Sequence, residues 1–201
     1  MRSIALCALA LLILIANSYA DDTTNTTVDI KTQGTTTSPN TINQDKKPTL
    51  SPELLVKVQD LIKKDDILVS RESSDDALFQ EFEGCMLGKR KKPCQDVPGM
   101  AKRLKDNIGR IEKGVKELRA QWENINIAGK SGFGLLKNVE MVRLEAFLLA
   151  LEAKRQYVET LDPTYKAYYK EYLNQGDIFS KRVKSLLGSM KGVNGSGPRS
   201  Q

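Results

Sequence analysis

Large apolar side chains recur every three or four positions from about residue 54 to residue 190. This spacing places them on one face of an α-helix, which repeats every 3.6 residues. The pattern is clearest after Pro93, where the interval alternates between four and three residues. No segment shows the alternation of a β-strand, so the pattern predicts an all-α fold. The residues of this heptad seam are Val97, Ala101, Leu104, Ile108, Ile111, Val115, Leu118, Trp122 and Ile125.

The two longest apolar patterns predict a pair of helices, 98–127 and 135–161, joined by a glycine-rich turn at 129–134. The middle of the second helix is apolar almost all round, which is typical of a helix at the centre of a bundle. We therefore expect a helical bundle built on this long central hairpin. The heptad seam has two alternative partners: another helix of the same chain, or a second copy of the chain in a homodimer.

Capping residues and helix breakers indicate where the outer helices begin and end. Ser51 followed by Pro52 predicts a helix start, and so does Asp162 before its proline. The polar segment 174–177 is expected to break or kink the last helix. Four tyrosines of this helix share one face, which favours packing on the bundle over an interface role. They are Tyr165, Tyr168, Tyr169 and Tyr172.

The N-terminus has the layout of a secretory signal peptide. Arg2 precedes an apolar run that ends at Ile15, and small residues stand at Ser18 and Ala20. The run is shorter than the about 18 residues of a membrane span, although a retained anchor is the alternative. We expect residues 1–20 to be removed and the mature chain to be secreted without a membrane span.

Residues 21–48 have a different composition, rich in threonine and poor in large apolar side chains. Such a segment cannot bury enough surface to offset its ordering entropy, so we expect a disordered tail. Asn25 lies in an N-glycosylation sequon of this tail, and Asn194 lies in a second one near the C-terminus. The helical domain is then expected at 49–191, followed by a flexible tail at 192–201.

Cys85 and Cys94 are the two cysteines left once Cys7 leaves with the signal peptide. In an oxidising compartment we expect them to form a disulfide, the alternative being two free buried thiols. A zinc site is not expected, because two thiols and no histidine cannot supply four ligands. The bond would close a short loop around the basic run that begins at Lys89.

Positive charge concentrates in and after this loop. The chain has 31 Lys and Arg against 25 Asp and Glu, and between Lys89 and Arg119 eleven basic residues face four acidic ones. Such a patch attracts sulfated glycans, anionic surfaces or acidic proteins. No aromatic interleaves the run, so nucleic acid is not expected. An ordinary solvated helix face is the alternative. The candidate binding residues are Lys89, Arg90, Lys91, Lys92, Lys102, Arg103 and Lys105.

Catalysis is not indicated. The chain has no histidine, and both thiols are expected in the disulfide, so the commonest general base and a thiol nucleophile are absent. The carboxylates Glu140, Glu145 and Glu152 have the spacing of ordinary helix-surface charges beside basic neighbours such as Arg143 and Lys154. We expect no enzyme activity, no cofactor and no metal.

The order of a signal peptide, a threonine-rich tail and a disulfide-linked helical domain resembles small secreted salivary or effector proteins of blood-feeding arthropods. The resemblance implies a protein that binds a host haemostatic, complement or matrix component without catalysing a reaction. We therefore expect a secreted binding or inhibitor protein that acts through the basic residues 89–119. The alternatives are a carrier of a small apolar ligand within the bundle and a self-associating structural protein.

Overall fold

The computed structural model describes residues 51–90, 93–126 and 133–193, with side chains as far as residue 190. These residues belong to one unit of the chain, Pro48–Gln201. Within them the chain forms helices and no strand, which confirms the all-α prediction. The helices are α2 (Pro52–Ser73), α3 (Asp76–Met86), α4 (Val97–Glu123), α5 (Phe133–Thr160) and α6 (Pro163–Val193).

Several sequence predictions concern segments outside these ranges. They are the signal peptide 1–20, the tail 21–48 with its sequon at Asn25, the second sequon at Asn194 and most of the turn 129–134. These statements stay predictions.

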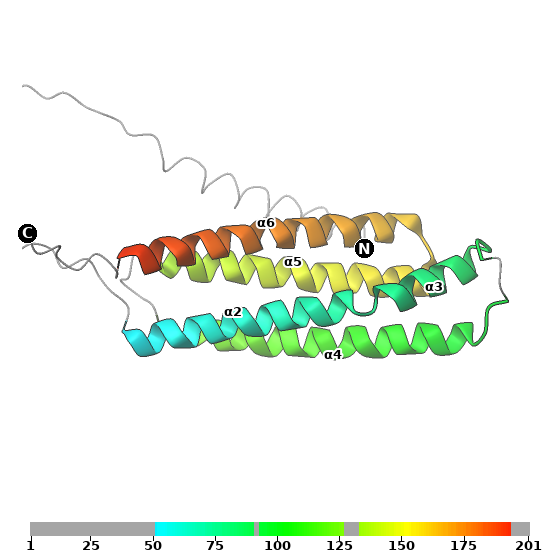
Figure 1. Ribbon diagram of the computed structural model, residues 1–201. Helices are drawn as coiled ribbons and strands as arrows, with labels where there is room; N and C mark the ends of the chain where they lie inside the picture. The colour runs from blue at the N-terminus through cyan, green and yellow to red at the C-terminus, as the bar shows by residue number, and fades with distance from the viewer. Residues whose placement is uncertain (1–50, 91–92, 127–132, 194–201) are drawn as a thin grey trace, which may run out of the picture. The chain divides into compact units, whose positions relative to one another are not determined.

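The helices run back and forth along one direction (Figure 1). α2 and α3 follow one another, α4 returns beside both, α5 reverses again, and α6 runs back along α5. A break at Ser74 and Asp75 therefore divides one long rod into α2 and α3. The result is an antiparallel four-helix bundle built on the α4–α5 hairpin, as the sequence predicts.

The heptad seam of α4 forms the centre of the core. From Leu104 to Ile125 every seam residue is buried, together with apolar side chains of α2, α5 and α6. Met100, rather than the predicted Ala101, is the buried residue in the first turn of the seam. The seam is therefore buried within a single copy of the chain, as the first of the two alternatives expects. α4 ends at Glu123, short of the predicted residue 127.

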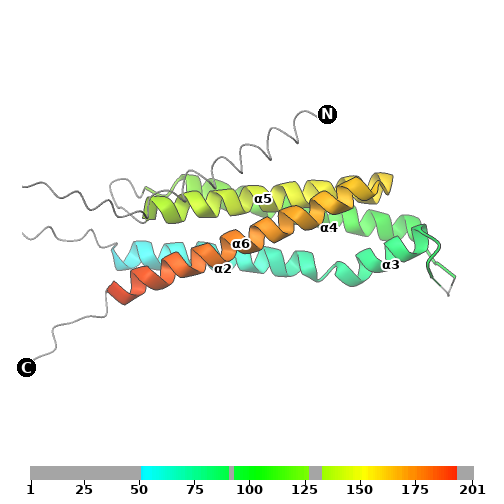
Figure 2. The ribbon, with the colours of Figure 1, turned by 90° about the horizontal axis from the view of Figure 1, so that it is seen from above.

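α6 passes through residues 174–177 without interruption, so the predicted break is wrong. Gly176 costs about 1 kcal/mol relative to alanine in a helix. Tyr172 and Val183, which are buried on either side of it, hold the helix on the bundle and outweigh that cost. Viewed from above, α6 crosses the bundle at an angle, from the C-terminal end of α5 toward the start of α2 (Figure 2).

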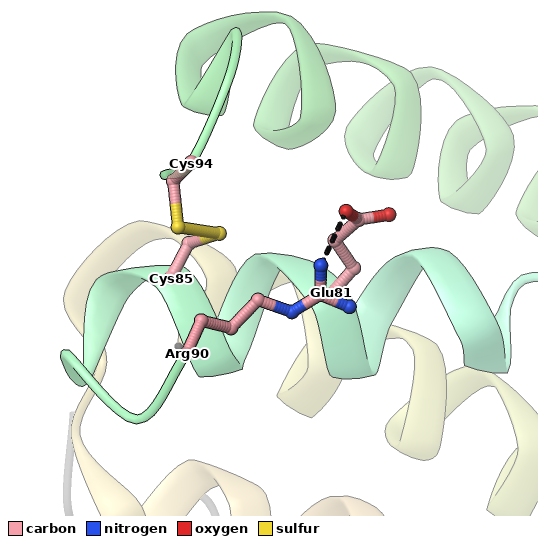
Figure 3. Close-up of a disulfide and its surroundings, with 4 residues drawn as sticks. All are labelled: Glu81, Cys85, Arg90 and Cys94. Atoms are coloured by element: carbon pink, nitrogen blue, oxygen red, sulfur yellow. Dashed lines mark hydrogen bonds and ion pairs between the residues drawn. A yellow bond between two sulfur atoms is a disulfide. The ribbon is translucent and has the colours of Figure 1, made fainter. Parts of the chain in front are cut away.

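The predicted disulfide is present. Cys85 at the end of α3 is bonded to Cys94, which precedes α4, and their Cα atoms lie 5.7 Å apart (Figure 3). The bond thus joins the end of α3 to the segment that precedes α4.

Replacing both cysteines with alanine should lower the free energy of unfolding by about 2–3 kcal/mol, because the unfolded chain regains the entropy of a short closed loop. Urea unfolding of the oxidised protein and of the variant measures the difference. Equal stability of the two proteins would contradict this assignment of the bond's role.

Two glycines of α4 form a matched pair for a second test. A Cβ atom at Gly109 would meet nothing within 4 Å, whereas one at Gly114 would lie 2.8 Å from Cδ2 of the buried Leu68 on α2. Gly109→Ala should raise the free energy of unfolding by about 0.5–1 kcal/mol through helix propensity alone. Gly114→Ala should gain less or lose stability, because Leu68 must move. Equal gains in urea unfolding would show that α2 and α4 do not approach closely at Gly114.

Candidate functional site

The loop after α3 is shaped by a glycine and closed by the disulfide. Gly88 adopts a left-handed φ of 63°, and its N–H donates to the Cys85 carbonyl at 3.2 Å. The N–H of Lys89 donates to the Gly84 carbonyl at 2.9 Å. These two bonds form a Schellman motif, which ends a helix by satisfying its last carbonyl groups. The backbone therefore turns sharply before the basic run.

Arg90 folds back along α3 from this turn. Its guanidinium donates to Glu81 Oε1 at 2.8 Å (Figure 3). A Cβ atom at Gly84 would lie 3.2 Å from Cγ of Arg90, so the glycine leaves room for the arginine stem. Lys89 and Arg90 are both exposed, and Lys91 and Lys92 lie outside the described residues.

The start of α4 depends on Asp96, which caps the helix. Its carboxylate accepts a hydrogen bond from the Gly99 N–H at 3.0 Å, and its φ is 49°. A Cβ atom at Gly99 would lie 1.9 Å from the Asp96 carboxylate, so only glycine fits under this cap. The cap fixes the direction in which α4 leaves the loop.

Three candidate residues follow within the first turns of α4, and all three are exposed. Lys102 and Arg103 form no ion pair with any described residue, and Arg103 donates only to the Gly99 carbonyl at 3.4 Å. Lys105 Nζ lies 3.9 Å from a carboxylate oxygen of Glu159. We call the group of Lys89, Arg90, Lys102, Arg103 and Lys105 the basic end.

Further along α4 most of the predicted patch is neutralised. Lys113 lies 3.9 Å from Glu117, and Lys116 lies 2.6 Å from Glu112. Arg119 pairs with both Glu123 and Glu145. Arg110 is bonded to Asn107 instead of a carboxylate. Among the described residues of 89–119, the cations without a carboxylate partner are Lys89, Lys102, Arg103 and Arg110. The first three belong to the basic end, whose other two members, Arg90 and Lys105, are paired with Glu81 and Glu159.

Charged side chains also lie inside the bundle, where the sequence did not predict them. Glu140, Arg143 and Lys154 of α5 are 0%, 4% and 1% exposed, so their interpretation as surface charges is wrong. Glu145 and Glu152 do lie at the surface, as predicted, and pair with arginines. The signal that could have identified the buried ones is the wide apolar surface of α5, because a helix of this kind turns most of its faces, and the charges on them, into the bundle.

Arg143 lies among three acids, the buried Asp65 and Glu140 and the partly exposed Asp66, and among the described residues it is the only cation that pairs with them. Its Nη2 donates to Asp66 Oδ1 at 2.8 Å, and its Nε lies 2.9 Å from Asp65 Oδ2 without the alignment of a hydrogen bond. Its Nη1 lies 3.6 Å from Glu140 Oε2. We call these four residues the central acid cluster.

The two most buried carboxyl groups of this cluster compete for protons. Without a proton between them, the oxygens of Asp65 and Glu140 accept no hydrogen bond from the described residues. Burial, followed by the charge of Asp65, raises the pKa of Glu140 to about 8, although Arg143 opposes the shift. Burial likewise raises the pKa of Asp65 against the attraction of Arg143. The proton that Glu140 keeps at neutral pH can be shared with Asp65.

A second buried group links three helices through Glu72 of α2. Lys154 Nζ of α5 lies 2.6 Å from Glu72 Oε1, and the Tyr169 hydroxyl of α6 donates to the same oxygen at 2.6 Å. The Lys154 ammonium also lies 5.0 Å from the centre of the Phe79 ring. The packing role predicted for the tyrosines is confirmed for Tyr169 and Tyr172, whereas Tyr168 is exposed.

A third group repeats this arrangement nearer the disulfide. The Tyr157 hydroxyl of α5 donates to Glu83 Oε1 of α3 at 2.5 Å, and Lys166 of α6 donates to the same oxygen. The two bonds lower the pKa of Glu83 despite its partial burial.

The described residues contain no group of three or more His, Cys, Asp or Glu side chains arranged to hold a metal ion. Among the described helices, none has both the length and the apolar character that crossing a membrane requires.

Comparison of the chain with protein-family models, with curated proteins and with solved structures finds no match in any of the three. The class of this protein is therefore described by its own fold and candidate site. It is a disulfide-linked antiparallel four-helix bundle with a basic end and with charged groups buried between α2–α3, α5 and α6.

The buried carboxyl group makes stability depend on pH. The folded protein keeps a proton on Glu140 that the unfolded chain releases above about pH 4.3, so the free energy of unfolding should fall as pH rises toward 8. In Glu140→Gln the decrease in the free energy of unfolding between pH 5 and pH 8 should be smaller than in the wild type by at least about 1.4 kcal/mol. This is the free energy that corresponds to a pKa shift of one unit. Urea unfolding at the two pH values measures it.

Glu152→Gln is the matched control, since the same substitution on the same helix then affects an exposed carboxylate. It should keep the wild-type pH dependence. If Glu140→Gln and the wild type gave parallel pH profiles, the protonation assigned to Glu140 would be wrong.

Proposed function

We propose that the protein is a secreted, non-enzymatic binding or inhibitor protein that engages an extracellular polyanion or acidic protein surface through the basic end. One observation carries the proposal. Lys102 and Arg103 are exposed beside a disulfide-closed basic loop and have no carboxylate partner among the described residues, whereas Lys113 and Lys116 farther along α4 are paired.

Whether a cation already forms an ion pair within the protein decides how much it can contribute to binding an anionic partner. A lysine already beside a glutamate must exchange one carboxylate for another, so it gains little from an external anion. An unpaired cation keeps its full attraction, and several of them together steer an anionic partner. The disulfide and the Asp96 cap hold the loop and the first turns of α4 in place, which lowers the ordering cost of binding.

A sulfated glycan is the simplest partner of this chemistry. It supplies repeated anionic groups, and no aromatic residue between Lys89 and Arg119 is available to stack on nucleic-acid bases. The disulfide agrees with an extracellular location, because such bonds persist in oxidising compartments. A partner bound by exposed charges should dissociate as salt screens them.

Charge reversal at Lys102 and Arg103 tests the proposal. The double variant Lys102→Glu, Arg103→Glu should elute from immobilised heparin at a clearly lower salt concentration than the wild type, because it removes two unpaired cations from the basic end. A variant that reverses Lys89, Arg90, Lys91 and Lys92 should lose retention altogether. Salt-gradient chromatography measures both.

The matched control is Lys113→Glu, Lys116→Glu, which changes the net charge of the same helix equally but at paired positions. Its elution should stay close to that of the wild type. If both double variants shifted equally, retention would reflect net charge, and the basic end would not be a binding site. Wild-type elution below physiological salt would also count against the proposal.

A further inference from the structure

A cleft of about 180 Å³ opens between α2, α5 and α6, beside the central acid cluster. Asp65 and Asp66 of α2 and Arg143 of α5 form one side of it. Tyr172 and Asp177 of α6 lie on the other side. The α6 residues that line it, from Tyr172 to Lys184, belong to the middle of that helix.

We propose that this cleft binds a small organic cation, a primary ammonium group carried by a short apolar body. The site is separate from the basic end and does not depend on the function proposed for it. It also differs from the carrier of an apolar ligand that the sequence left as an alternative, because the wall of the cleft is acidic.

Acid exceeds base around the cleft. Asp65, Asp66 and Asp177 line it, against the two cations Arg143 and Lys184. Arg143, one of these cations, is already committed to the acids of its own cluster. The other, Lys184, is exposed, where its repulsion of a ligand is screened by water.

A buried carboxylate of the cleft has an ion-pair partner, Arg143, but no aligned hydrogen-bond donor among the described residues. Asp65 is 1% exposed, and neither of its oxygens accepts a hydrogen bond from the described protein. One proton shared with Glu140 cannot satisfy the four oxygens of the pair. An ammonium group supplies three N–H donors and a positive charge. It therefore matches what the buried wall needs, while a neutral apolar ligand would leave the acids desolvated and unpaired.

The remaining lining sets the size and character of the ligand body. Val69, Phe147 and Leu173 are apolar, and Tyr172 adds an aromatic ring. The volume is below the about 300–1,000 Å³ of pockets for drug-sized ligands, so the body must be short. A divalent metal is not supported, because the described residues hold no group of three His, Cys, Asp or Glu side chains arranged to bind one.

Calorimetric titration at pH 7 tests the proposal. The protein is titrated with butylammonium and with 2-phenylethylammonium, and separately with the two alcohols that have the same carbon skeletons. At least one ammonium probe should bind saturably with one site, and its alcohol should bind about tenfold more weakly or not at all, since a charged hydrogen bond is worth about 1.5–3 kcal/mol. Failure of both ammonium probes to saturate in the millimolar range, or equal binding of amine and alcohol, would overturn the proposal.

Variants locate the binding. Asp66→Asn and Asp177→Asn should each weaken the ammonium probe by about tenfold, while leaving the core of the cluster in place. Asp60→Asn is the control, because Asp60 is an exposed residue of α2 paired with Lys64 outside the cleft. An equal loss in Asp60→Asn would indicate general charge attraction and reject the site.

Discussion

The inner faces of α5 are buried within the bundle, and every charge on them must find a partner inside the protein. Removing a charge from water costs several kcal/mol unless an opposite charge and hydrogen bonds replace the water. The chain meets this constraint at three successive levels, through Arg143 with Asp65, Lys154 with Glu72, and Tyr157 with Glu83.

These partners follow the same order along the sequence of α2 and α3 as along that of α5. On α6 the order is reversed, because this helix is antiparallel to α5: Tyr169 contacts Glu72, and the earlier residue Lys166 contacts Glu83. A shift of one heptad would leave the apolar seam packed but these charges unpaired. We infer that the buried pairs select the register of the bundle while the apolar seam of α4 supplies its cohesion.

The two ends of this arrangement differ in what they present to solvent. Near the disulfide, the buried acid Glu83 is satisfied by Tyr157 and Lys166, so the surface around it is free to carry unpaired cations. Farther along the bundle Arg143 faces two ionised acids, Asp65 and Asp66, beside the protonated Glu140, and the remaining negative charge lies at a cleft. The proposed partner surface is positive and the proposed ligand cleft is negative, and the two lie in different parts of the bundle.

The sequence was sufficient to predict the elements that local pattern controls. The heptad seam, the hairpin, the helix starts at Pro52 and Pro163 and the disulfide are all as expected. The two errors have one cause. Residues 174–177 contain a glycine that weakens an isolated helix, and Glu140 and Arg143 have the spacing of a surface pair. In both cases tertiary packing decides, since α6 is held by buried side chains and the part of α5 that carries Glu140 and Arg143 faces the bundle interior. Of the candidate site, the loop and its cations were predicted, but which cations stay unpaired was not. Pairing depends on carboxylates such as Glu81 and Glu159 that come from other helices.

The oblique course of α6 links the register of the bundle to its cleft. Near its start α6 reaches α2 and α3 through long polar side chains, Lys166 to Glu83 and Tyr169 to Glu72. Near its end it packs Val183 into the apolar core shared with α2. Between these two contacts the helix must pass over the central acid cluster, where Gly176 has no side chain with which to fill the space. A larger residue there would cover the acids but could not neutralise them. Because a covered and uncompensated carboxylate is more costly than one that water or a cation can reach, the cleft follows from the acid surplus beneath it.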